Sequence, residues 1–228
     1  MKKGFVKIDD IVWDKDARSF LPKQTPAVVE YDDDYNLTEA VSDYLSDAYG
    51  FCHYGFRYQL LSVLLSMSTQ EIIKLSRGEQ SLILRQGAVC PEGAKVYIYA
   101  EKPKSRSDWG LCIDNGAFAW IPKSDYNYAM MRRIPIVSGL VVGEFVCGGH
   151  LRNCEMANAD IAEYKTGIKR EKLLKMAGGK ELIGILMSDL KFYGQARPLT
   201  DFSRINGTQV KRVTKPITYV TYEGGETE

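Results

Sequence analysis

The sequence is poor in the residues that carry redox, metal or nucleophilic chemistry. Its 228 residues include two histidines and five cysteines. The cysteines are odd in number and widely spaced, which argues against a disulfide framework and for reduced thiols. No uninterrupted apolar run is long enough to cross a bilayer, and MKKGFVKIDD at the N-terminus has no apolar stretch of the signal-peptide kind. We therefore expect a cytoplasmic protein with no membrane partner.

Nucleotide-binding fingerprints and a strong net charge are also missing. Neither Gly-x-x-x-x-Gly-Lys-[Ser/Thr] nor Gly-x-Gly-x-x-Gly occurs, so we predict no cofactor. Residues 1–60 carry 7 Lys and Arg against 11 Asp and Glu, a net −4, whereas residues 61–228 carry 23 against 18, a net +5. The opposite signs predict two units, 1–60 and 61–223, followed by a disordered acidic tail at 224–228. A basic second unit favours polyanionic partners.

Residues 1–60 predict a small β-β-α-β unit. Its helix has apolar residues at helical spacing on one face, and Gly50 ends it. The segment YLSDAYGFCHYGF resembles a short module of phage and Firmicute proteins. The expected strands and helix of this unit are residues 5–13, 27–31, 37–48 and 51–60.

Two features of this unit could bind a metal, and each has a simpler explanation. Cys52 and His53 are adjacent, but neighbouring strand residues point to opposite faces, which favours structural roles over a shared metal or catalytic site. The three aspartates at 32–34 could hold a hard cation, but a helix N-terminus favours negative charge without one.

The segment that follows organises the second unit. Ser68 and Glu71 have the spacing of a capping box at the start of a helix, and Gly78 suits its end. Arg85, near the end of an apolar strand, can present a planar five-donor fork to phosphates, carboxylates or base edges. The expected strands and helix are residues 60–67, 68–76, 81–86 and 95–100.

Several segments, in their order along the chain, resemble the ASCH family, small β-barrels related to the RNA-binding PUA domains. They are GEQSLILR, VYIYAEKP, VVGEF, SDLKFYGQARPLTDF and TKPITYV. The resemblance covers about residues 62–222 and implies an α+β fold, a PUA-like (ASCH) mixed β-barrel with flanking helices. It also implies RNA or a nucleotide-like ligand, with Arg85, Gln80 and Ser81 in the binding pocket.

The sequence departs from the amidohydrolase members of that family at the positions that do the chemistry. Their signature Lys falls at Gln80, and their Thr or Glu falls at Ile83; neither residue can act as a nucleophile or titrate. Release of an acyl group from cytidine would need replacements, for which the weak candidates are Ser81, Glu144, Lys74 and Lys102. Ser81 as nucleophile would need an adjacent base, and the departures favour a binding protein over an enzyme.

Residues 105–135 form an insertion relative to the family pattern. Asp114-Asn115-Gly116 between apolar strands is a strong hairpin signal, with strands expected at 111–113 and 117–121. Aromatic rings interleaved with cations could stack bases and neutralise phosphates. Packing of the rings against the barrel is the more frequent outcome. The residues concerned are Trp109, Phe118, Trp120, Tyr126, Tyr128, Arg132 and Arg133.

Glu144 lies within an apolar run, where a carboxylate needs a partner or a cavity. Arg85 is the expected partner; without it, Glu144 would be the best candidate for a general base. Cys147, His150 and Cys154 have zinc-like spacing but supply only three ligands, so no metal is predicted.

A basic helix is expected at residues 167–176. Ile168, Leu173, Leu174 and Met176 are expected to face inward. Its lysines could contact a phosphate backbone or simply face solvent, which is the usual case.

The sequence supports three hypotheses of function. The first is a nucleic-acid or modified-nucleoside binding protein with a regulatory role, using Arg85 and the cations Lys102, Lys104, Arg132, Arg133, Lys211 and Lys215. The second is an adaptor or inhibitor that binds a host protein through the acidic first unit and the aromatic insertion. The third is an amidohydrolase with non-standard residues.

Overall fold

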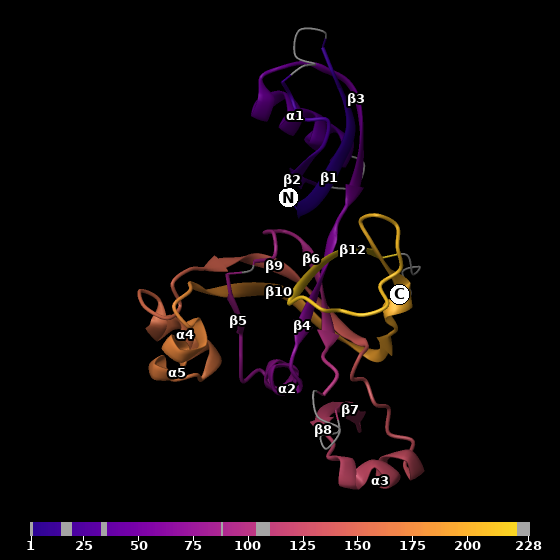
Figure 1. Ribbon diagram of the computed structural model, residues 1–228, viewed down its shortest axis with the longest axis vertical. Helices are drawn as coiled ribbons and strands as arrows, with labels where there is room; N and C mark the ends of the chain where they lie inside the picture. Colours follow the sequence, from indigo (N-terminus) through magenta and orange to yellow (C-terminus); the bar gives the residue numbers. More distant parts are fainter. Residues whose placement is uncertain (1, 15–19, 33–35, 88, 104–109, 223–228) are drawn as a thin grey trace.

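The N-terminal residues form a three-stranded antiparallel sheet with a helix against it. The computed structural model describes residues 2–14, 20–32, 36–87, 89–103 and 110–222. Buried residues of alternate positions in β2 pack with the apolar face of α1 in a separate core. The element order is the predicted β-β-α-β, and this part lies at one end of the molecule (Figure 1). The sheet order is β2-β1-β3, with bounds β1 (Lys2–Trp13), β2 (Thr25–Tyr31), α1 (Leu37–Tyr49) and β3 (His53–Leu60).

A seven-stranded mixed sheet forms the centre of the molecule, so the chain is α+β. Its order is β11-β12-β4-β6-β9-β10-β5, and only the β4–β6 pair is parallel among the pairings of the described residues. In the described part of the chain no ladder joins β5 to β11, and the closed PUA-like barrel stays a prediction. The strands are β4 (Ser62–Met67), β5 (Leu82–Gln86), β6 (Lys95–Ala100), β9 (Val141–Leu151), β10 (Leu182–Arg197), β11 (Phe202–Arg204) and β12 (Ile217–Tyr222).

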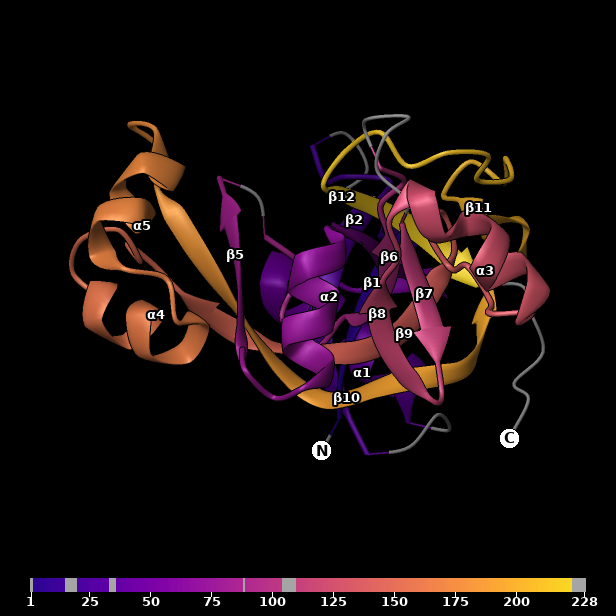
Figure 2. The same cartoon turned by 90° about the horizontal axis from the view of Figure 1, so that it is seen from below.

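The central strands are apolar on both sides because both faces of this sheet are covered. On one face, Val63 and Ile98 pack with Ile72 of α2 (Thr69–Ser76) and with Phe118 of the inserted hairpin. The covering by α2, β7 and β8 is visible from below (Figure 2). On the other face, alternate residues such as Tyr97 pack under the segment that contains β11 and the loop to β12. That second face is therefore covered by loop rather than by helix.

The far ends of β9 and β10 extend beyond the centre and carry two short helices, α4 (Ala159–Thr166) and α5 (Arg170–Ala177) (Figure 1). Leu173 and Ala177, one helical turn apart, are the buried residues of α5. The prediction for two other residues is wrong: Leu174 is 49% and Met176 38% exposed. A helix of two turns buries one narrow face, and Leu173 and Ala177 already occupy that face.

The inserted hairpin is confirmed, with β7 (Leu111–Asp114) and β8 (Ala117–Trp120) paired antiparallel. Asn115 and Gly116 both have positive φ, 49° and 78°, as a type I′ turn requires. A 3-10 turn, η1 (Lys123–Asp125), and α3 (Tyr126–Met131) follow, and the sequence did not predict this helix. Phe118 is buried against Phe192, whereas Trp120 and Tyr128 are about half exposed.

Some predicted features fall outside the described residues: Lys104, Trp109, Asp33, Asp34 and the tail at 224–228. No helix in the described part of the chain combines the length and the apolar character needed to span a bilayer.

Candidate functional site

Arg85 makes its contacts within the protein. Its Nη1 donates to Glu71 Oε1 at 2.6 Å and to the Leu84 carbonyl at 2.7 Å, and its Nη2 donates to the Ser66 carbonyl at 2.7 Å. The side chain is 12% exposed. Glu71 also accepts from the Ser68 N–H and hydroxyl, as the predicted capping box requires. Arg85 therefore ties β5 to the start of α2, and its role in ligand binding stays a prediction.

The predicted pairing of Arg85 with Glu144 is wrong, because Glu144 has other partners. Its Oε1 lies 3.3 Å from Lys95 Nζ, and the Tyr193 hydroxyl donates a short hydrogen bond to its Oε2. Burial raises the pKa of Tyr193, and the bond to Glu144 raises it further. Arg197 stacks over the Tyr193 ring at 4.2 Å. Glu144 is thus held in a network of phenols and cations.

The two weak catalytic candidates do not form a nucleophile–base pair. Ser81 is exposed and directly precedes β5, where Leu82 pairs with Leu186 of β10. Glu144 pairs with Lys191 of the same strand, so the two sites differ by roughly four strand residues, or about 13 Å along β10. Nucleophile and base need hydrogen-bond distance.

Gln80 is also placed away from solvent. It is 6% exposed, and its Nε2 donates to the Leu82 carbonyl at 2.6 Å. The amide side chain therefore holds the start of β5.

The cysteines and histidines do not assemble into a metal centre. His150 Nε2 lies 2.7 Å from the Cys90 carbonyl and 3.7 Å from Cys147 Sγ. Cys154 belongs to another cluster, under α4 and α5. Within the described ranges, no group of three or more His, Cys, Asp or Glu is placed to hold a metal ion.

Burial also keeps the Cys147 thiol protonated. Its pKa is raised first by desolvation, and the His150 Nε2–H that donates to the Cys90 carbonyl is not available as a base on that nitrogen. Cys147 is 1% exposed, and in this arrangement its thiol is not an activated nucleophile.

The loop between β11 and β12 carries cations predicted to bind a ligand. The Val210 N–H donates to the Phe202 carbonyl at 2.8 Å, and the Ser66 N–H donates to the Pro216 carbonyl at 2.9 Å, which fixes the loop near both ends. The exposed side chains between these anchors are Lys211, Arg212, Thr214 and Lys215.

This loop and the end of β6 line a hollow of about 560 Å³. Lys102 contributes from just beyond β6, and its aliphatic stem lies over Gly139, where a Cβ would collide with it. The structure thus brings together Lys102, Lys211 and Lys215, three of the predicted cations, and adds Arg212.

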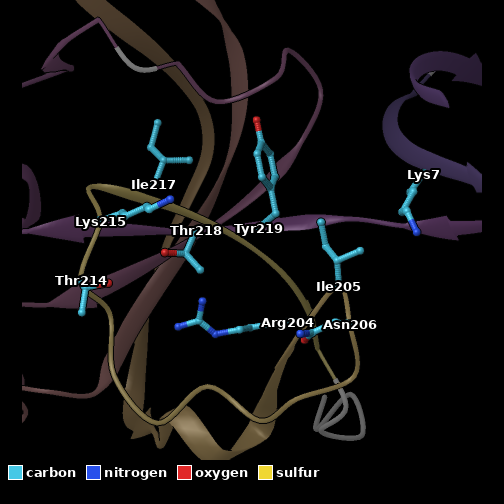
Figure 3. A pocket seen from close by; sticks show the side chains of 9 residues that line it. All are labelled: Lys7, Arg204, Ile205, Asn206, Thr214, Lys215, Ile217, Thr218 and Tyr219. Atoms are coloured by element: carbon cyan, nitrogen blue, oxygen red, sulfur yellow. The ribbon is translucent and has the colours of Figure 1, made fainter. Parts of the chain in front are cut away.

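A second hollow, of about 500 Å³, adjoins the first at Thr214 and Lys215. Arg204, at the end of β11, extends into it toward Thr218, and Lys7 of β1 stands at its other end (Figure 3). We call the two adjoining hollows the cationic groove. Its cationic side chains are Lys7, Lys102, Arg204, Lys211, Arg212 and Lys215.

Most of these charges are uncompensated. Lys7 pairs with Asp9 at 2.8 Å, but no other cation of the groove forms an ion pair with the described parts of the chain. Glu101 is the carboxylate in the lining, and it accepts a hydrogen bond from the Ser66 hydroxyl at 2.9 Å. The groove therefore has a net positive lining that favours an anionic ligand.

Two predicted cations lie elsewhere, and besides Arg212 two further cations of the groove, Arg204 and Lys7, were missed. Arg132 and Arg133 directly follow α3. That helix lies away from β12 (Figure 1), and Arg132 stacks on Tyr128 at 5.4 Å. Arg204 was missed, although the turn signal Asn206-Gly207 beside it could have placed it at a strand end. Nothing in the sequence indicated that Lys7 would lie near the C-terminal strand.

Comparison with known proteins adds a limited structural likeness. No family model and no curated protein matches the sequence. The similar solved structures include the ASCH protein of Zymomonas mobilis and two single-residue mutants of it, at 10–11% identity. They cover 60% of this chain and 73–76% of theirs, with a TM-score of 0.40. A likeness of this size does not establish a family, and it offers no support for a phage or Firmicute origin of residues 1–60.

Proposed function

We propose that this protein binds nucleic acid, with RNA as the first ligand to test, through the cationic groove. The observation that carries the proposal is the convergence of Lys102, Lys211, Arg212 and Lys215 on one hollow without ion pairs among the described residues. Unpaired ammonium and guanidinium groups along a groove are suited to a chain of phosphates. The resemblance of the sequence to relatives of RNA-binding domains is the reason to begin with RNA.

The amidohydrolase alternative has weaker support. Its candidate nucleophile Ser81 and candidate base Glu144 are far apart along β10. The groove is lined mainly by cations, and the serine of its hydroxyl–carboxylate contact, Ser66 to Glu101, is only 9% exposed. Binding without turnover is therefore the function that the geometry favours.

The affinity for an unstructured RNA of about twenty nucleotides, measured by fluorescence anisotropy from 50 to 200 mM KCl, tests the proposal. Log affinity should fall linearly with log salt, because each neutralised phosphate releases counterions. We expect Lys215→Glu to weaken binding about tenfold at 100 mM salt, a loss of about 1.4 kcal/mol, and to reduce the salt slope.

Lys172→Glu is the matched control, because Lys172 is an exposed lysine of α5 away from the groove and the change in net charge is the same. This substitution should leave the affinity for RNA within about twofold of the wild-type value. The proposal would be contradicted if the affinity for RNA changed neither with salt nor in Lys215→Glu. Equal losses of affinity in Lys215→Glu and Lys172→Glu would also contradict it.

A further inference from the structure

A third hollow, with a mainly apolar lining, opens beside the cationic groove. Its volume is about 340 Å³, and it shares Lys7, Ile205 and Tyr219 with the groove. It is built from both sheets, because Phe5 belongs to β1, Leu61 joins β3 to β4, and Tyr219 belongs to β12. Its lining residues are Phe5, Lys7, Gln24, Thr25, Pro26, Leu61, Ile205 and Tyr219.

Two aromatic rings meet in this hollow. Phe5 and Tyr219 have ring centroids 5.5 Å apart at an interplanar angle of 39°, and Tyr219 is 37% exposed. Both rings are on fixed strands: the Leu61 N–H donates to the Phe5 carbonyl at 2.8 Å, and Tyr219 pairs with Val63 of β4. A ligand would thus find aromatic surface that is already in place, which reduces the entropic cost of binding.

Resting on the proposed function, we infer that this apolar hollow receives one unstacked base of a single strand whose phosphates lie in the cationic groove. The two surfaces are contiguous, because Ile205 and Tyr219 line both the apolar hollow and the second hollow of the cationic groove. Arg204 and Lys215 line that same second hollow. Single-stranded nucleic acids bind with phosphates along cations and bases on aromatic rings. A duplex keeps its base faces stacked and could not use the Tyr219 surface.

The hollow is also large enough for one planar ring system, because ligand pockets begin at about 300 Å³. The inference gives the N-terminal sheet a function: Phe5, Lys7 and Pro26 come from β1 and β2 and complete a site on the larger sheet. An acidic peptide with an aromatic side chain is the competing occupant.

The contributions of phosphates and bases to the affinity can be separated with two oligonucleotides of equal length. One carries bases and the other has abasic sites throughout. The full-length protein should bind the first about tenfold more tightly at equal salt, with the same salt slope for both. Ribose and deoxyribose versions distinguish RNA from DNA as the source of the strand.

Variants of Tyr219 test whether the preference for the strand with bases arises in the apolar hollow. Tyr219→Ala should abolish the difference between the two oligonucleotides, and Tyr219→Phe, which keeps the ring, should restore it. Tyr164→Ala is the control, because Tyr164 is 89% exposed on α4. Thermal unfolding checks that each variant is folded, and the wild-type comparison decides the question even where a variant fails to fold.

Equal affinity of the wild type for intact and abasic strands would overturn the inference and leave the proposed function standing. Binding of neither strand would overturn the proposed function itself. Tighter binding of an acidic aromatic peptide than of any strand, lost in Tyr219→Ala, would assign the hollow to a peptide and overturn the inference as well.

Discussion

At the scale of single residues, Arg85 shows that a side chain suited to recognition can make its hydrogen bonds inside the fold. Three of its N–H groups face one carboxylate and two backbone carbonyls, and the Glu71 carboxylate is itself largely covered. Removal of the guanidinium would leave Glu71 and the Ser66 carbonyl without this donor, and an unsatisfied partly buried group costs more than the lost bond.

We therefore expect Arg85→Ala to lower the free energy of unfolding by about 2–3 kcal/mol and to leave the affinity for nucleic acid unchanged. Urea denaturation and anisotropy measure the two effects separately. Arg132→Ala, an exposed arginine, should cost less than about 0.5 kcal/mol. Unchanged stability together with a large loss of affinity would contradict this expectation and support the ligand-binding role that the sequence predicted for Arg85.

At the scale of elements, the short helix α2 depends on its first turn. It has eight residues, and its capping box joins Ser68 to Glu71 in both directions. Helices of this length are unstable by themselves, so the cap and the packing of Ile72 and Leu75 hold it in place. The same Glu71 receives Arg85, which couples the start of the helix to β5.

Ser68→Ala should cost about 1 kcal/mol of stability, since the Glu71 N–H loses its acceptor. Ser76→Ala, in the last turn of the same helix, should change stability by less than about 0.5 kcal/mol. In a double-mutant cycle, Ser68→Ala and Arg85→Ala should be non-additive by about 0.5 kcal/mol or more, because both act on Glu71. Additive losses would show that the cap and the ion pair are independent.

At the scale of the whole molecule, four thiols are buried in three different core clusters, two of them in the same one. The pKa of each is raised first by desolvation, that of Cys90 to about 12. Because the folded protein holds these protons more tightly than the unfolded chain, their contribution to stability is complete below about pH 9 and is lost as pH rises toward 12. The four residues are Cys90, Cys112, Cys147 and Cys154.

The free energy of unfolding should consequently fall from pH 8.5 to pH 11 in denaturant titrations. Cys90→Ala should make this fall shallower by up to about 1.4 kcal/mol per pH unit, the effect of one proton. Cys52→Ala removes an exposed thiol and should leave the slope as it is. A slope that Cys90→Ala does not change would show that Cys90 titrates alike in both states.

Local features of the fold followed from the sequence. The cap at Ser68 and Glu71 and the hairpin turn at Asn115-Gly116 depend on hydrogen bonds or backbone angles within a few residues. The strand at 95–100 was equally clear because its β-branched and aromatic residues favour extended structure. The sequence did not predict α3, because its six residues, rich in aromatics and methionine, show little helical periodicity of apolar residues.

The sequence by itself determined most strands, the cap at Ser68, the hairpin turn and the presence of several cations near the C-terminus. Only the tertiary structure decided which distant groups meet: Arg85 with Glu71 rather than Glu144, and Lys7 beside the loop from β11 to β12. The physical reason is that capping and turn formation depend on neighbours along the chain. The pairing of charges and the lining of a groove depend on how strands that are far apart in sequence align within the sheets.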